Sequence, residues 1–363
     1  MKVLFIVTRA DNIGGSHIHV RDLAKKLTEE GHQVCIAMGG PGPVVNHYQS
    51  FGLEPIIIPE LDREISLMKD FRAYRGLKKV MNDYKPDLVS THSSKAGFLG
   101  RLAAKATGIP VLFTAHGWSF TSGKSWLSRK AFLQLEKIVA PISKKIITVS
   151  DYDRKLALSN LNSSPDDIVT IHNGMPDIDR ERIEKTRSDE INIVMVARFD
   201  NQKNHIELLD AVHKLNGYHI HFIGDGPLQD KVQKHAEALS IDSKITFWGR
   251  LDSVAEVLEK SDIFALISNW EGFPRSTLEA MRAGLPVIVS NVGGAGEAVE
   301  HGVTGYIVEK GDVNSLENYI NTLLLSEVKR KEMGLKGRQR FETFFEFEIM
   351  YQKTLSIYKE ILC

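Results

Sequence analysis

Cysteine is scarce in this chain, with two among 363 residues: Cys35 inside an apolar run and Cys363 at the last position. Cysteines so placed are expected to stay unpaired, which fits a reducing cytoplasm. Long apolar runs are also lacking, because the opening run KVLFIV is soon followed by charge. It is too short for a signal peptide or a membrane span, and no other segment approaches that length. We therefore expect a cytoplasmic protein.

Net charge is absent overall, since 46 lysines and arginines balance 46 aspartates and glutamates. The balance is uneven, however: residues 1–172 hold 23 basic and 16 acidic side chains, and residues 173–363 hold 23 and 30. This asymmetry either indicates that the first half faces something anionic or reflects chance variation between two domains. No groove motif of the kind that binds nucleic acid is recognised in the sequence, so nucleic acid is not an expected partner.

Buried strands and amphipathic helices alternate along the chain, which predicts an α/β fold with parallel sheets. The rhythm is interrupted by the charged stretch PDIDRERIEKTRSDE, which is typical of a linker, and then restarts with INIVMVAR. We predict two doubly wound, Rossmann-like domains over residues 1–172 and 173–345. An amphipathic helix over residues 346–363 is expected to return to the first domain. Because such sheets bind ligands at the carboxyl ends of their strands, an inter-domain cleft is the expected site.

Two expected strands of the first domain end in residues suited to a ligand. Gly14 and Gly15 lead into a helix, where glycine admits a close approach of phosphate or sugar and the helix N-terminus favours anions. His116 follows the strand IPVLFTA, in the active-site position of this architecture. Taken alone, each has a plain structural alternative: a tight turn for the glycines, and a backbone-bonded imidazole for the histidine.

The second half places cations and carboxylates after its expected strands. Arg198 and Lys203 follow INIVMVA near a helix start, a combination that suits a pyrophosphate unless both are solvated surface cations. Glu271 leaves the strand DIFALIS, and Glu279 follows inside the next helix, where Pro274 suits the first turn. Carboxylates accept well from sugar hydroxyls, although a capped helix with a solvated glutamate would look the same. GDGP, from Gly224 to Pro227, is an expected tight turn that leaves room for a ligand, and Gly249-Arg250 follows the strand KITFW; the alternative for both is a plain turn.

The order of these motifs resembles the retaining glycosyltransferases of the GT-B fold, and most closely glycosyltransferase family 4. The resemblance covers essentially the whole chain and rests on the Gly-Gly loop, TAHG, HNGM, ARFDNQKN, GDGP, FWGR, the E-x7-E motif EGFPRSTLE and SNVGGAGEAVEHGVTGYIV. The segment HSSKAGFLGRLAAKATGIP is further similar to bacterial members that build surface polysaccharides on lipid carriers. The GT-B fold consists of two Rossmann-like domains facing a cleft.

The resemblance implies a role for each matched residue. Arg198 and Lys203 would neutralise the donor pyrophosphate, Glu279 would hold the nucleotide ribose, and Glu271 would contact donor-sugar hydroxyls. His116 would lie beside the donor sugar. The remaining expected binding residues are Gly14 and Gly15 near the phosphates and acceptor, Gly224 and Arg250 near the base, and Gly272, Phe273, Pro274 and Leu278 along the sugar. Pro274 and Arg275 replace the Gly-Leu that is commoner in the family, which bears on which donor hydroxyls are recognised.

The implied reaction moves a hexose or N-acetylhexosamine from a nucleotide diphosphate sugar, by resemblance UDP-linked, to a glycan or lipid-linked acceptor. Retention is expected through a front-face step in which the leaving phosphate takes the acceptor proton. A double displacement through Glu271 is the alternative. No cofactor or metal is expected: the D-x-D matches at Asp151–Asp153 and Asp177–Asp179 are interpreted as a helix cap and part of the linker.

A basic and aromatic stretch over residues 118–145 predicts peripheral docking on the anionic inner face of the plasma membrane. From Lys124 to Lys145 it has six basic residues and one acidic, interleaved with Trp126, Leu127 and Phe132. The alternative is a core helix with a solvated basic face.

Three other functions share the expected fold. A nicotinamide dehydrogenase would have a GxGxxG motif after the first strand and an acidic residue after the second, and neither is evident. A GT-B sugar-nucleotide epimerase would act without an acceptor and would lack the ordered Arg-Lys and E-x7-E set. A non-catalytic partner subunit would have lost some of these charged positions, which are intact here.

Overall fold

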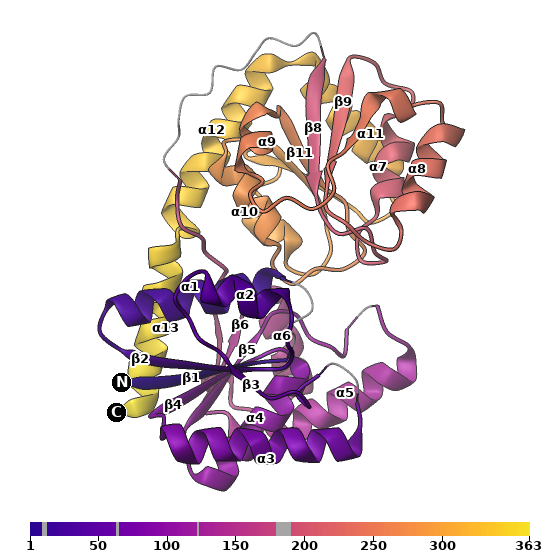
Figure 1. Ribbon diagram of the computed structural model, residues 1–363. Coiled ribbons are helices and arrows are strands. Elements are labelled where there is room, and N and C mark those ends of the chain that lie inside the picture. The colour runs from indigo at the N-terminus through magenta and orange to yellow at the C-terminus, as the bar shows by residue number, and fades with distance from the viewer. Residues whose placement is uncertain (9–12, 63–64, 122, 179–189) are drawn as a thin grey trace. The chain divides into compact units, whose positions relative to one another are not determined.

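The computed structural model describes residues 1–8, 13–62, 65–121, 123–178 and 190–363 (Figure 1). The chain forms two compact units. The first consists of Met1–Asn173 together with Tyr351–Cys363, and the second of Gly174–Met350. Residues 179–189, most of the predicted linker and including Asp179, lie outside the described residues.

The first unit contains a parallel sheet of seven strands in the order β3-β2-β1-β4-β5-β6-β7. Its central strands are buried on both faces, as expected when helices cover each side. The strands are β1 (Lys2–Val7), β2 (Gln33–Met38), β3 (Ile56–Ile57), β4 (Leu88–His92), β5 (Val111–Ala115), β6 (Lys145–Thr148) and β7 (Ile168–Thr170).

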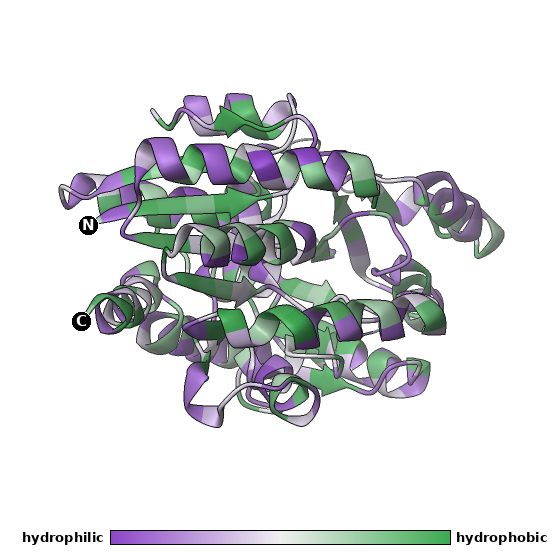
Figure 2. Ribbon diagram, turned by 90° about the horizontal axis from the view of Figure 1, so that it is seen from below, coloured by the Kyte–Doolittle hydropathy of each residue, from purple (hydrophilic) through white to green (hydrophobic). Residues whose placement is uncertain are grey.

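Helices of the first unit cover both faces of this sheet, with α1 on one face and α3 and α4 on the other (Figure 1). The hydropathy colouring shows the strand beside the N-terminus green along its length, whereas the helices alternate between green and purple (Figure 2). The helices are α1 (Gly15–Glu29), α2 (Pro43–Gln49), α3 (Leu67–Tyr84), α4 (Ser94–Thr107), α5 (Trp126–Val139), α6 (Asp151–Asn160) and α13 (Phe347–Leu362), with 3-10 turns η1 (Ala140–Ile142) and η2 (Pro165–Asp167).

The second unit repeats the design with six parallel strands in the order β10-β9-β8-β11-β12-β13. They are β8 (Ile191–Val196), β9 (Tyr218–Ile223), β10 (Ile245–Phe247), β11 (Ile263–Leu266), β12 (Val287–Ser290) and β13 (Gly305–Val308). The helices are α7 (His205–Val212), α8 (Gln229–Ala238), α9 (Ala255–Lys260), α10 (Arg275–Arg282), α11 (Val313–Leu325) and α12 (Glu327–Phe344), with 3-10 turns η3 (Asp242–Lys244) and η4 (Ala295–Ala298).

The predicted pair of doubly wound parallel sheets is confirmed. Strand order reverses between β1 and β4 in the first sheet and between β8 and β11 in the second. Ligands of such sheets bind outside the carboxyl ends of the strands at this reversal. Both points therefore mark where a site is expected. In the described part of the chain, no helix combines the length and apolar character that crossing a membrane requires.

Candidate active site

The loop after β8 is fastened to the loop after β11, across the strand reversal of the second sheet. The backbone amide of Asn204 donates to the backbone carbonyl of Ile267 at 2.9 Å. The backbone amide of Asn269 donates to the backbone carbonyl of Gln202 at 2.7 Å. Asn204 also caps α7, since its side chain accepts from the Glu207 amide. These backbone contacts bring Lys203 to Glu271, residues 68 positions apart.

Glu271 is held by three side-chain donors. Lys203 forms an ion pair with Oε1, and the Ser268 hydroxyl donates to the same oxygen at 2.7 Å. The Gln202 amide donates to Oε2 at 3.1 Å. Because the Glu271 side chain is only 6% exposed, this arrangement fixes the carboxylate in one orientation. A carboxylate so occupied is suited to positioning a ligand rather than to attacking one.

Arg198 differs from Lys203 in having no partner. The side chain is exposed just past β8, and no residue in the described ranges forms a hydrogen bond or ion pair with its guanidinium. The next residue, Phe199, is buried and stacks on His205 with ring centroids 4.2 Å apart, which anchors the loop. Arg198 therefore offers its full fork of donors to an anion.

Glu279 lies on α10, and the structure describes no hydrogen bond to its carboxylate. Burial raises the pKa of Glu279, while the nearby charges of Arg275 and Arg282 act in the opposite direction. Those arginines donate instead to backbone carbonyls: Arg275 to Gly174 at 3.0 Å and Arg282 to Pro176 at 2.7 Å. Arg275 is thus engaged within its own unit. A largely desolvated carboxylate without donors is suited to accept from hydroxyl groups of a ligand.

The turn from Glu271 into α10 contributes backbone rather than side chains. Gly272 is partly exposed, Phe273 is buried against Phe345 with ring centroids 5.5 Å apart, and Leu278 is fully buried. Pro274 is the N-cap residue, one position before the helix, and no side chain caps it. The prediction that Pro274 lies in the first turn is therefore displaced by one residue.

Two glycines are required by close backbone approaches near these loops. At Gly224, which has φ +142°, a Cβ would lie 2.1 Å from the Ala197 carbonyl oxygen at the end of β8. At Gly293, with φ +59°, a Cβ would lie 1.9 Å from the Glu271 carbonyl oxygen. The sequence analysis gave Gly293 no role, although it belongs to the quoted stretch SNVGGAGEAVEHG. Arg250, the remaining candidate, is exposed after β10.

In the first unit, Gly14 is the N-cap of α1 and Gly15 its first residue, both exposed. The Gly14 amide donates to His17 Nδ1 at 3.1 Å. His116 is partly buried at the end of β5, beside the strand reversal. The sequence analysis missed its two histidine neighbours, His19 from α1 and His92 at the end of β4.

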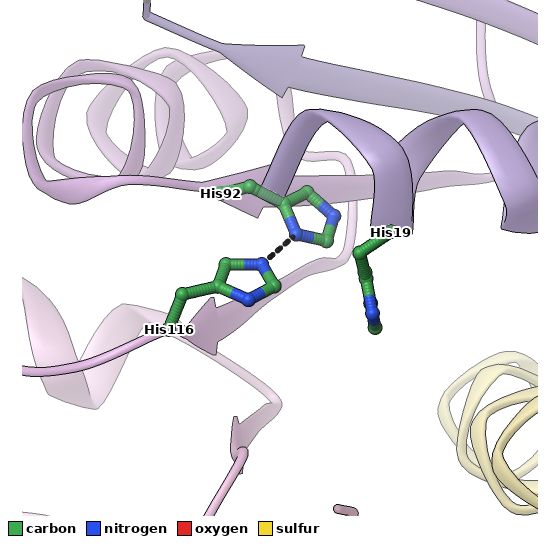
Figure 3. Close-up of side chains that lie close together, drawn as sticks. All are labelled: His19, His92 and His116. Carbon is green, nitrogen blue, oxygen red and sulfur yellow. Dashed lines mark hydrogen bonds between the residues drawn. The ribbon is translucent and has the colours of Figure 1, made fainter. Parts of the chain in front are cut away.

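The three histidines lie close together (Figure 3). His92 Nδ1 and His116 Nε2 share a hydrogen bond of 3.1 Å, and the His19 ring packs edge-on against His116 at 4.9 Å between centroids. Burial lowers the pKa of His92 well below its usual value, and His116 and His17 lower it further. One nitrogen from each ring lies within 4.8 Å of the others, so the cluster has the ligand types of a metal site.

The D-x-D matches have structural partners. Ser150, not an aspartate, caps α6 by accepting from the Asp153 amide, with Asp151 and Asp153 in the first turn. The Asp153 carboxylate also accepts from the Ser150 hydroxyl at 2.8 Å. Asp177 pairs with Arg338, which lowers the pKa of Asp177.

Comparison with known proteins adds independent evidence. The family model described as Glycosyltransferase Family 4 matches residues 13–177, and the model Glycosyl transferases group 1 matches residues 177–340. The chain is 31% identical over 316 residues, 82% of this chain and 81% of the relative, to an Escherichia coli UDP-Gal:alpha-D-GlcNAc-diphosphoundecaprenol alpha-1,3-galactosyltransferase. It is 26% identical to the Staphylococcus aureus capsular polysaccharide biosynthesis glycosyltransferase CapM, over 84% of this chain and 85% of that one.

Solved structures agree on the fold. Anabaena HepE, crystallised with UDP and glucose, superposes with a TM-score of 0.87 at 19% identity, covering 99% of this chain and all of the other. A sucrose-phosphate synthase from Thermosynechococcus elongatus gives 0.86 at 19% identity, covering 99% and 98%.

Proposed function

Because this chain belongs to glycosyltransferase family 4, we propose that it transfers a hexose or N-acetylhexosamine from a UDP-sugar to a lipid-linked glycan, with retention of configuration. The observation that carries this proposal is the arrangement at the β8/β11 reversal. There a fixed Lys203–Glu271 pair follows the strand ends, together with Arg198, whose guanidinium has no partner among the described residues. The names of two relatives support the context, since one is a UDP-galactose enzyme acting on a diphosphoundecaprenol substrate and one builds a capsule.

The roles follow from charge and hydrogen bonding. Arg198, free to form a bidentate contact, neutralises the departing diphosphate, and Lys203 adds a point charge while holding Glu271. Glu271 accepts from donor-sugar hydroxyls, and Glu279 accepts from the ribose hydroxyls. His116 lies beside the sugar. Gly14, Gly15, Gly224 and Arg250 contact the phosphates, acceptor or base, and the backbone of Gly272, Phe273, Pro274 and Leu278 borders the sugar.

The bond from the anomeric carbon to the diphosphate breaks while the acceptor hydroxyl attacks the same face. The released phosphate oxygen takes the acceptor proton, so no side chain is needed as base or nucleophile. The occupied oxygens of Glu271 support this route over a double displacement. No step requires a metal ion, and we propose activity in the presence of EDTA.

A panel of nucleotide sugars, screened by thermal stabilisation and then by transfer to a lipid-diphosphate acceptor, tests the proposal.

Arg198→Ala should lower kcat about 100- to 1,000-fold, the usual effect of removing one preorganised charge partner. Exposed Lys214→Ala in the same unit is the matched control and should leave kcat unchanged. An unchanged kcat for Arg198→Ala, or conversion of the sugar nucleotide without an acceptor, would contradict the proposal. NMR of the product anomer tests retention, and a trapped glycosyl-Glu271 adduct would refute the front-face step.

Residues 118–145 support a peripheral contact with an anionic membrane. The one acidic residue between Lys124 and Lys145, Glu136, is buried in an ion pair with Arg101 at 2.7 Å, so it does not offset the basic surface. Trp126 and Leu127 are 62% and 71% exposed at the start of α5. The Lys130 ammonium lies 3.9 Å from the centroid of the Trp126 ring, so charge and apolar surface occur together.

A further inference from the structure

A chain of side-chain hydrogen bonds runs from the last helix to His116, entirely within the first unit. The Tyr358 hydroxyl of α13 donates to Ser90 Oγ on β4 at 3.2 Å. Ser90 Oγ bonds His92 Nε2 at 3.0 Å, and His92 Nδ1 bonds His116 Nε2 at 3.1 Å (Figure 3). Tyr358, Ser90 and His92 are each at most 1% exposed, so water does not compete for these contacts.

The direction of the chain follows from counting donors. Ser90 Oγ accepts from Tyr358, and its own hydrogen has one acceptor among the described residues, His92 Nε2. His92 Nε2 is then an acceptor, so the proton of the neutral ring is on Nδ1. That proton is donated to His116 Nε2, which leaves the His116 proton on Nδ1. The opposite direction would give Ser90 Oγ two donors and leave its own buried hydrogen without a described acceptor, which is costly.

A metal ion in the three-histidine cluster would need a different arrangement. If the two nitrogens that share the hydrogen bond, His92 Nδ1 and His116 Nε2, were the ligand atoms, both would have to be unprotonated, which moves the His92 proton to Nε2. Nε2 would then donate to Ser90, which already accepts from Tyr358. The hydrogen bonds of Ser90 and Tyr358 behind the cluster thus favour a hydrogen-bonded pair of histidines over a metal site.

We propose that Ser90 and His92, held by Tyr358, are positioning residues that keep His116 in its Nδ1–H tautomer, so that it donates to an oxygen of the transferred sugar. This inference rests on the proposed function. A fixed donor at the sugar holds the reacting carbon in place without adding a positive charge near a carbon that itself becomes cationic. His92 is the first residue of the segment HSSKAGFLGRLAAKATGIP, for which the sequence offered only a family resemblance. This segment thereby gains a physical role at His92.

The tautomer can be measured directly. In the full-length protein with ¹⁵N-labelled histidine, long-range ¹H–¹⁵N spectra distinguish Nδ1–H from Nε2–H rings, and His116→Gln assigns the signals. We expect an Nδ1–H His116 in the wild type. Ser90→Ala should produce a mixture or the Nε2–H form and lower kcat about 100-fold, as for loss of one aligned donor, with donor KM nearly unchanged. Tyr358→Phe should shift the same signals by a smaller amount.

Matched variants separate positioning from folding. Thr91→Val removes a neighbouring buried hydroxyl that donates to the Leu112 carbonyl at 3.0 Å, and Tyr351→Phe removes a second buried phenol of α13, which donates to Glu30 at 2.6 Å. Both should leave the His116 tautomer unchanged whatever they do to stability. His92→Asn places an amide donor near the lost Nδ1–H and should retain most activity, whereas His92→Leu should not.

Two results would overturn the proposal: a wild-type His116 protonated on Nε2, or Ser90→Ala and His92→Leu variants with unaltered tautomer and kcat. Stoichiometric Zn²⁺ that survives EDTA and removes both ring N–H signals would overturn it as well. The tautomer is read without substrate, so its outcome does not depend on the donor. If no nucleotide sugar is turned over while the tautomer pattern holds, the proposed function fails and the positioning chain stands.

Discussion

At the scale of single residues, His205 connects site geometry to pH. It stacks on Phe199, its Nε2 is buried without a described hydrogen-bond partner, and burial lowers its pKa to about 3. The folded state therefore binds fewer protons than the unfolded state below pH ~6.5, so stability is present above that pH and is lost as pH falls toward 3. Lowering the pH from 7.5 to 5.5 should remove about 1 kcal/mol of the free energy of unfolding through His205.

Urea denaturation of wild type, His205→Gln and His205→Phe at those two pH values checks this. Both variants should lose the His205 part of the pH dependence, and the phenylalanine variant should keep the stacking. The expectation would be wrong if all three proteins had the same pH slope.

Replacing Glu279 is predicted to raise the stability of the free protein and to remove its binding of UDP. Because burial raises its pKa, the ionised carboxylate costs stability in the free protein at neutral pH, and that cost disappears as pH falls through the raised pKa. Glu279→Gln should therefore raise Tm at pH 7. The same change should abolish the thermal shift produced by UDP. A lower Tm with intact UDP binding would show that Glu279 is a structural residue.

At the scale of elements, the buried ion pair between Arg101 and Glu136 links α4 to α5. Arg101 is fully buried, stacks over Phe113 at 4.3 Å and donates to the Gly97 carbonyl as well as to Glu136. Glu136→Gln leaves that cation without its charge partner and should cost about 3–5 kcal/mol in the unfolding of the first unit. Glu360→Gln, at the Lys145–Glu360 pair in which the glutamate side chain is exposed, is the control and should cost less than about 1 kcal/mol. Equal costs for the two variants in urea denaturation would contradict this.

Elements were also where the sequence was most informative. Continuous apolar runs such as KVLFIV predict buried strands. Of the residues chosen because they follow such runs, His116 and Arg198 lie one and two positions past β5 and β8, whereas Glu271 lies five positions past β11. The partners of these residues could not be predicted. Lys203 meets Glu271 across 68 positions and Tyr358 meets Ser90 across 268, because both contacts depend on the register of packed elements. His92 ends the strand LVSTH, so the strand-end position that singled out His116 was available for it as well, although a purely structural histidine fits that position equally.

At the scale of the whole molecule, the predicted membrane contact is testable. Arg129 and Lys130 are exposed on α5 beside Trp126. The protein should sediment with vesicles rich in anionic lipid, and Arg129→Glu with Lys130→Glu should abolish this at physiological salt, because charge near the surface supplies about 1 kcal/mol per residue. Lys329→Glu with Lys331→Glu on α12, in the other unit, is the matched control. Equal sedimentation of both double variants would exclude a docking role for α5.

The assignment of residues 351–363 to the first unit has a consequence for synthesis. A ribosome releases residues 1–173 long before Tyr351 and Tyr358 emerge. While the second sheet is made, the nascent first sheet therefore lacks α13, and Ser90 lacks its tyrosine partner. A stalled or prematurely stopped chain would carry both sheets, yet lack the phenol that completes the hydrogen bonds behind His116.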